Sequence, residues 1–157
     1  MKIQLINTGK TTEKHVKEGV EIYATRLKNY VLFEYIDLPE IKQAKNVTFD
    51  KLKELEGEII LKKVLKTDYV VVLDEKGLEY GSTEFAGHLQ KIMNRGIKNM
   101  AFVTGGPYGF SRQVYDRAND RISLSRMTFP HQLVRLIFIE QLYRSFTILN
   151  NEPYHHI

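Results

Sequence analysis

Two segments in the last third of the chain carry residue types that could bind a ligand closely and present it for reaction. One is the glycine loop Gly105-Gly106-Pro107-Tyr108-Gly109, and the other is the run Leu124-Ser125-Arg126-Met127-Thr128-Phe129. Glycines let a ligand approach the backbone and supply the positive φ that tight turns need. Each segment follows an apolar stretch typical of a strand, and open α/β sheets bind ligands beyond the carboxyl ends of strands. We expect both segments, together with the end of a strand at 68–73, to form one binding crevice.

The spacing of the glycines argues against the common phosphate-binding loops. Gly105, Gly106 and Gly109 match neither the Walker motif nor the dinucleotide fingerprint, and no lysine follows that could reach phosphates. A nucleoside triphosphate site is therefore not expected. A tight turn, without any ligand, remains an alternative reason for these glycines.

A long helix is predicted over residues 130–149, directly after the second segment. Thr128 is placed to cap its free amides, and Pro130 suits its first turn, where no hydrogen bond is lost. His131 and Arg135 are four residues apart and share one helical face. Arg135 lies among apolar residues, where an unpaired guanidinium would be costly. We therefore expect Arg135 to have a dedicated partner.

Metal binding and nucleophilic catalysis find little support in the sequence. His131, His155 and His156 follow no zinc-site spacing, so no metal is expected. Ser123 and Ser125 do not lie in a nucleophile-elbow motif, and the chain has no cysteine. What remains is a transfer reaction, in which the protein orients two reactants and a cofactor supplies the chemistry.

The composition is that of one folded domain. The 157 residues are 43% hydrophobic and 27% charged, and their apolar runs are far shorter than the ~20 residues that cross a bilayer. Residues 2–7 begin directly with a strand pattern, which leaves no room for a signal peptide. Together with the absence of cysteine, these features predict a cytoplasmic protein without a membrane segment.

The basic residues favour an acidic partner, nucleic acid foremost. The formal net charge is +4 and the isoelectric point is near 9.2. All 15 lysines lie at or before Lys98, whereas six of the eight arginines follow it. Arginine is a rigid fork suited to phosphates and base edges. Solvated surface charge is the alternative interpretation.

Strands and helices are predicted to alternate along the chain. Apolar periodicity places a first helix after Thr11-Thr12-Glu13, with one face running from Val16 to Leu27, and a turn at 74–77. The other predicted helices are 49–65, 83–95, 111–118 and 130–149, and the predicted strands are 2–7, 30–38, 68–73, 100–104 and 121–125. This alternation predicts an α/β fold with a mainly parallel sheet and helices on both faces.

Four blocks in the second half resemble the RlmH family, which are SPOUT-class methyltransferases of large-subunit ribosomal RNA. The blocks are 105–109, 124–135, 140–144 and 153–155, and they occur in the family's order. The likeness spans the full length, so the resemblance implies one SPOUT domain over residues 1–157. It also implies that the C-terminal part is threaded into a trefoil knot.

The resemblance implies a cofactor and a partner subunit as well. The family binds S-adenosylmethionine through residues that correspond here to Leu73, Gly105 and the run 124–129, from Leu124 through Ser125, Arg126, Met127 and Thr128 to Phe129. It acts as a homodimer, with the last helix at the interface. The tail of one subunit reaches the cofactor site of the other.

The implied reaction is methylation of N3 of pseudouridine 1915 in 23S ribosomal RNA, on the assembled ribosome. Arg135 and Arg144 would hold RNA phosphates or the target base, while His131, Tyr154 and His155 would line the acceptor pocket. The group that takes the N3 proton stays open between His131, His155, Glu140 and water. A SPOUT enzyme acting on transfer RNA and a non-catalytic ribosome-binding module are the alternatives.

Overall fold

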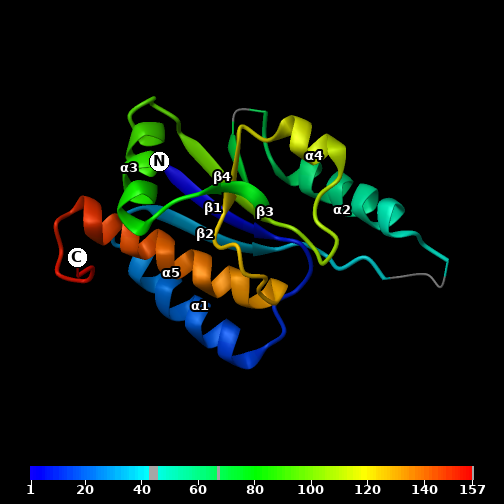
Figure 1. Ribbon diagram of the computed structural model, residues 1–157, viewed down its shortest axis with the longest axis horizontal. Helices are drawn as coiled ribbons and strands as arrows, with labels where there is room; N and C mark the ends of the chain where they lie inside the picture. The colour runs from blue at the N-terminus through cyan, green and yellow to red at the C-terminus, as the bar shows by residue number, and fades with distance from the viewer. Residues whose placement is uncertain (43–45, 67, 157) are drawn as a thin grey trace.

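The computed structural model describes residues 1–42, 46–66 and 68–156, and it shows a five-stranded parallel sheet. The strands lie in the order β2-β1-β4-β3-β5 (Figure 1). Strand β1 pairs with both β2 and β4 in unbroken register along its whole length. The bounds are β1 Lys2–Asn7, β2 Leu32–Asp37, β3 Tyr69–Glu79, β4 Asn99–Thr104 and β5 Asp120–Ser123.

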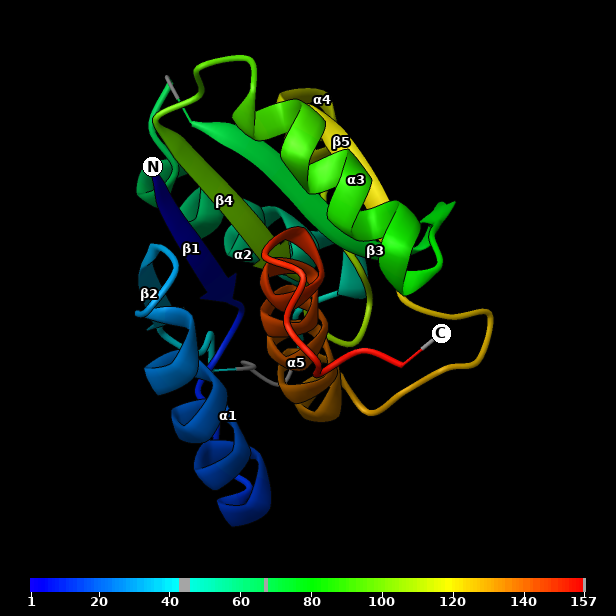
Figure 2. The ribbon, with the colours of Figure 1, turned by 90° about the vertical axis from the view of Figure 1, so that its left-hand side faces the viewer.

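Helices cover both faces of this sheet. Figures 1 and 2 show α1, α3 and α5 on one face and α2 and α4 on the other. The bounds are α1 Lys14–Leu27, α2 Phe49–Lys63, α3 Ser82–Met93, α4 Arg112–Arg117 and α5 His131–Leu149. None of these helices is long and apolar enough to span a membrane. The predicted fold class, a parallel α/β sheet between two helical layers, is confirmed.

The strand side chains alternate between two hydrophobic clusters, one on each face. Val71 and Leu73 of β3 pack with α1, α3 and α5, whereas Val70 and Val72 pack with α2 and α4. A strand that is covered on both faces has to be apolar at successive positions. This is why the uninterrupted run of apolar residues in β3 was a good indicator of a central parallel strand.

The predicted turn at 74–77 is wrong, because β3 continues through it to Glu79. The pairing with β5 is interrupted by a bulge, so that Ile122 lies opposite both Leu73 and Leu78. Gly77 permits the bulge: a Cβ at this position would stand 2.5 Å from the carbonyl carbon of Ile122. A bulge needs glycine for close approach in the same way that a turn does, so the sequence signal was ambiguous.

The start of α1 agrees with the prediction, whereas the predicted cap of α5 is wrong. Helix α1 begins after Glu13, and the amides of Thr12 and Glu13 donate to Oε1 of Gln132 at 2.9 and 3.0 Å. Thr128 does not cap α5, which begins at His131 with Pro130 as its N-terminal cap. Gln132 of α5 therefore binds the two amides just before α1, although it lies more than a hundred residues away along the chain.

Candidate active site

Two adjoining cavities lie at the carboxyl ends of β3, β4 and β5. The larger, about 520 Å³, is lined by the glycine loop 105–109, by Thr104 and by the start of α5. The smaller, about 120 Å³, is lined mainly by residues 123–129. Six residues line both: Leu73, Asp74, Glu75, Thr128, Phe129 and Val134. The expected crevice between three strand ends is therefore present in the fold.

Seven of the eight residues predicted to contact a cofactor line these cavities, namely Leu73, Gly105, Leu124, Ser125, Met127, Thr128 and Phe129. The eighth, Arg126, does not line them. Its side chain is 91% exposed, and its Nε lies 3.3 Å from Oε2 of Glu79. Arg126 thus faces the surface beside the cavities.

The glycine loop is both a tight turn and a close wall of the larger cavity. Gly109 has a φ of 81°, and its amide donates to the Gly106 carbonyl at 3.1 Å. Gly105 has ordinary φ, but a Cβ there would stand 3.2 Å from the Phe110 ring. The structure of this loop is therefore compatible with both interpretations of its glycines, namely that they form a tight turn and that they let a ligand approach the backbone.

The run 124–129 is held by short-range hydrogen bonds. The Ser123 hydroxyl donates to the Ser125 carbonyl at 3.1 Å, and the Met127 amide donates to Oγ of Ser125 at 2.9 Å. These bonds fix the backbone while the Met127 side chain stays 75% exposed. Residues 124–129 therefore line the cavity with a backbone that is held by hydrogen bonds, while the Met127 side chain stays exposed.

Asp74 and Tyr115 are cavity residues that sequence reasoning missed. The Tyr115 hydroxyl donates to Oδ2 of Asp74, and the Lys76 amide donates to Oδ1 at 2.8 Å. Burial and the Asp74 carboxylate raise the pKa of Tyr115 to about 12. The only signal was an acidic residue directly after a buried strand, in a segment whose pattern predicts a turn.

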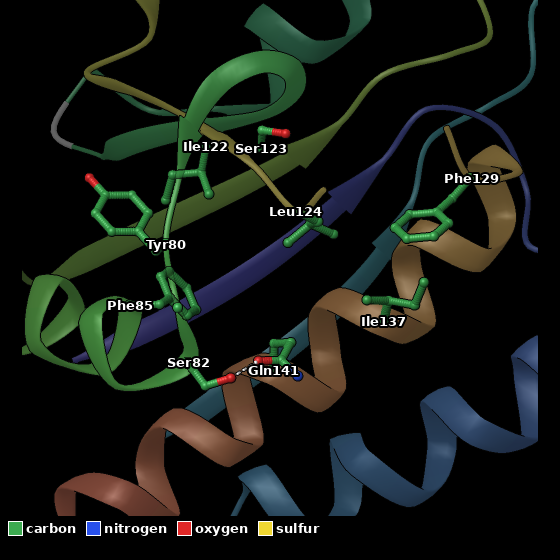
Figure 3. A pocket seen from close by; sticks show the side chains of 10 residues that line it. Tyr80, Ser82, Phe85, Ile122, Ser123, Leu124, Phe129, Ile137 and Gln141 are labelled. Carbon is green, nitrogen blue, oxygen red and sulfur yellow. Dashed lines mark hydrogen bonds between the residues drawn. The ribbon is translucent and has the colours of Figure 1, made fainter. Parts of the chain in front are cut away.

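A third cavity, about 290 Å³, lies between the start of α3, the end of β5 and the middle of α5. Leu124 and Phe129 belong to its wall and also to the smaller cavity described above. Figure 3 shows Ser82 and Gln141 at one side of it, where the Ser82 hydroxyl donates to Gln141 Oε1 at 2.9 Å. Its remaining walls are largely aromatic and aliphatic.

His131 and Arg135 occupy very different surroundings although they share a helical face. His131 is exposed and lines the larger cavity. Arg135 is only 1% exposed, and it donates to the Thr8 carbonyl and to the Thr11 hydroxyl, each at 2.8 Å. Its Nη1 also lies 3.6 Å from Oδ1 of Asp37. The expected dedicated partner of Arg135 is confirmed.

The other predicted site residues lie at the far end of α5. Arg144 pairs with Glu140 at 2.6 Å, and its Nη1 lies 3.3 Å from Nδ1 of His155. The Tyr154 hydroxyl donates to Glu140 at 3.0 Å. Burial and the neighbouring Tyr23 and Glu140 raise the pKa of Tyr154 above its ordinary value. The tail thus lies on the helix of its own chain.

This arrangement divides the five predicted catalytic residues into two groups. Arg144 is thirteen positions after His131 in the helix, which at a rise of 1.5 Å per position is about 20 Å. Arg144, with Tyr154 and His155 beside it, therefore lies away from the two cavities at the strand ends in this arrangement. In residues 1–42, 46–66 and 68–156, no group of three or more histidine and acidic side chains is placed to hold a metal ion.

The class of protein follows from this fold, this crevice and a comparison with known families. A family model described as "Predicted SPOUT methyltransferase" matches residues 1–155. The match covers nearly all of the chain, including every strand of the sheet and every wall of the cavities. The chain therefore belongs to the SPOUT methyltransferase family.

Curated relatives confirm the narrower resemblance to the RlmH family. The chain is 52% identical over 156 residues to the ribosomal RNA large subunit methyltransferase H of Christiangramia forsetii. It is 53% identical to the protein of that name from Parabacteroides distasonis and 51% identical to the one from Flavobacterium johnsoniae. Each of these alignments covers 99% of both chains.

Proposed function

We propose that this protein transfers a methyl group from S-adenosylmethionine to N3 of pseudouridine 1915 in 23S ribosomal RNA, on the assembled ribosome. The observation that carries the proposal is the crevice beyond β3, β4 and β5, which gathers seven residues that the family resemblance assigns to the cofactor. Relatives named as ribosomal RNA large subunit methyltransferases support the class of substrate. We include in this proposal that the C-terminal part forms the trefoil knot of the family.

The cavities suit this cofactor in size and in chemistry. Their volumes, about 520 and 120 Å³, fall together within the range of small-molecule sites. Leu73, Leu124 and Phe129 supply apolar surface for an adenine ring, and the glycine loop supplies backbone groups. Asp74 and Glu75 supply negative charge for a cofactor with two cationic centres.

The bound cofactor would supply an electrophilic methyl group, so the protein's task is alignment. The rigid loops at 105–109 and 124–129 would orient the donor and exclude water from it. Among the candidate proton acceptors, His131 is the one that lines the larger cavity, where the methyl donor would bind, and it is exposed there. Glu140 and His155 already interact with Arg144 at the far end of α5.

We assign Arg135 to positioning and not to direct RNA contact. A guanidinium that is 1% exposed and bound to Thr8 and Thr11 joins the start of α5 to the loop after β1. It would keep His131 and the cavity wall in place. Arg144 is 25% exposed and remains the arginine of α5 that could reach RNA.

A homodimer would explain the divided site. Arg144, which lies with Tyr154 and His155, is about 20 Å along α5 from His131 at the larger cavity. A two-fold symmetric pair of subunits with antiparallel α5 helices would bring the tail of one subunit to the cavities of the other. Each complete site would then contain residues of both chains.

The decisive experiment incubates ribosomes that lack the modification with the protein and S-adenosylmethionine carrying a labelled methyl group. We expect label on one nucleotide of 23S RNA in intact ribosomes and little on naked RNA, located by nuclease digestion and mass spectrometry. Label in transfer RNA would favour another SPOUT substrate. Calorimetry that detects no cofactor binding at millimolar concentration would leave only a non-catalytic ribosome-binding role.

A further inference from the structure

The methionyl part of the proposed cofactor ends in an α-ammonium group, and no acid is among the residues that the sequence assigned to cofactor binding. Asp74 lies directly after Leu73 and lines both cavities. We propose that Asp74 binds this α-ammonium group and so orients the methionyl part of the donor. The inference rests on the proposed function, because it names a subsite of the same crevice.

Asp74 is held in place by its own chain. Both carboxylate oxygens accept a hydrogen bond, Oδ2 from the Tyr115 hydroxyl and Oδ1 from the Lys76 amide. The Arg121 guanidinium lies over the Tyr115 ring, 4.1 Å from its centroid, and supports the ring. The bulge in β3 places this carboxylate at the cavity wall. A carboxylate fixed in this way loses little freedom when a ligand binds.

The two hydrogen bonds leave the negative charge of Asp74 without a cationic partner. In the described parts of the chain, the ion pairs do not include Asp74. An ionised carboxylate has about four acceptor positions, so two remain open. A half-buried carboxylate with open acceptor positions beside a cavity favours a cationic hydrogen-bond donor.

Among the groups of S-adenosylmethionine, the α-ammonium fits this description best. It combines a positive charge with three N–H donors, and charge-assisted hydrogen bonds are stronger than neutral ones. The sulfonium centre has a charge but no N–H to donate. The ribose hydroxyls can donate but are neutral. Ligands that lack one or another of these groups can therefore show whether Asp74 binds the ammonium, the sulfonium or the ribose.

The test is calorimetric binding of three ligands to the full-length protein and to Asp74→Asn. S-adenosylmethionine and S-adenosylhomocysteine both keep the ammonium group, while 5′-methylthioadenosine lacks the whole amino-acid part. We expect Asp74→Asn to weaken the first two by about tenfold, the cost of one charged hydrogen bond, and to leave the third unchanged. Tyr115→Phe should weaken the same two ligands, to a smaller extent.

Several outcomes would overturn the assignment. Equal weakening of all three ligands would place Asp74 against the adenosine part, and weakening of S-adenosylmethionine alone would place it against the sulfonium. No change in any ligand would remove Asp74 from the site. An equally large loss in Glu75→Gln would show a general effect of cavity charge.

Two controls separate these outcomes from other failures. Asp116→Asn removes a carboxylate that is 71% exposed on neighbouring α4 and should bind all three ligands as the wild type does. Thermal unfolding without ligand shows whether each variant is folded. If the wild type itself binds none of the ligands, the proposed function fails together with this inference; in every other outcome the proposed function stands.

Discussion

Arg135 shows how a single residue can suggest one role by its type and take another by its surroundings. The family resemblance implied that it contacts RNA, but its side chain is buried against Thr8, Thr11 and Asp37. Only Nε has no hydrogen-bond partner. A guanidinium in this setting contributes by holding α5 against the loop that follows β1.

Replacing Arg135 by alanine should lower the free energy of unfolding by about 3 kcal/mol, because it empties a buried site, leaves the Thr8 carbonyl without its side-chain donor and removes the bond to the Thr11 hydroxyl. Urea denaturation measures the change. Arg112→Ala is the matched control: this side chain is 93% exposed, and its loss should cost less than about 0.5 kcal/mol. Full stability of Arg135→Ala combined with lost ribosome binding would restore the RNA-contact interpretation.

Tyr115 permits a pH prediction. Its ordinary pKa of 10.0 is raised to about 12 in the folded protein, so its hydrogen bond to Asp74 stabilises the fold fully below pH 10. The stabilisation is lost as the pH rises from 10 to 12, when a phenolate would form beside the carboxylate. The stability difference between the wild type and Tyr115→Phe should therefore be constant from pH 7 to 9 and shrink above pH 10. A pH-independent difference would contradict this assignment.

At the scale of elements, the bulge in β3 is the feature that shapes the cavity wall. Because of the bulge, β3 continues beyond the edge of the sheet where the cavities lie. Asp74 lines the cavities, and the strand pairs with β5 again at Leu78, opposite Ile122. Gly77 makes this possible, because the backbones of β3 and β5 approach too closely there for any side chain.

Gly77→Ala should therefore destabilise the protein by about 2 kcal/mol and weaken cofactor binding, since a displaced bulge moves Asp74. Gly87→Ala is its control: Gly87 lies inside α3 with no atom within 4 Å of an added Cβ. This second change should stabilise the protein by about 0.5–1 kcal/mol, as expected for glycine in a helix. Thermal unfolding and calorimetry of both variants test the pair, and equal effects would show that the bulge tolerates a side chain.

At the scale of the whole molecule, α5 carries one group of site residues at each end. His131 lies at the cavities of its own chain, and Arg144 lies with the tail at the opposite end. If the active unit is a dimer, the two ends of one helix serve two different sites.

Mixing two inactive variants tests this arrangement. Thr128→Trp should block the cofactor cavity and His155→Ala should damage the tail, so each homodimer should be inactive. In a re-equilibrated equal mixture, half of the dimers are mixed, and each mixed dimer has one intact site, so activity should return to about one quarter of the wild-type level. Sedimentation equilibrium measures the mass of the assembly and so tests independently whether the protein is a dimer. No recovery from a mixture that forms mixed dimers would show that each site belongs to one chain.

The types of the elements and the place of the crevice were predictable from local pattern. Helical periodicity located α1 to α5 within a few residues, and the apolar runs located the buried strands. Because parallel strands end at the same edge of a sheet, the segments after Leu73, Thr104 and Ser123 were expected at one edge, where the order β4-β3-β5 makes them neighbours. The need of Arg135 for a dedicated partner also followed, since it lay among apolar neighbours.

The partners themselves were decided only by the tertiary structure. Thr8 is 127 positions from Arg135 in the chain, and Gln132 accepts a hydrogen bond from the amide of Thr12, 120 positions earlier. Local periodicity reports which residues are buried, but the order of the strands determines which buried groups meet. The same holds for Asp74 and Tyr115, which the bulge brings together across β3 and α4. Residue pattern alone was enough to predict the family, the layered sheet and the position of a ligand crevice, because these depend on local periodicity and motif order. Tertiary packing decided which side chains face the crevice and which stay inside to hold it in shape.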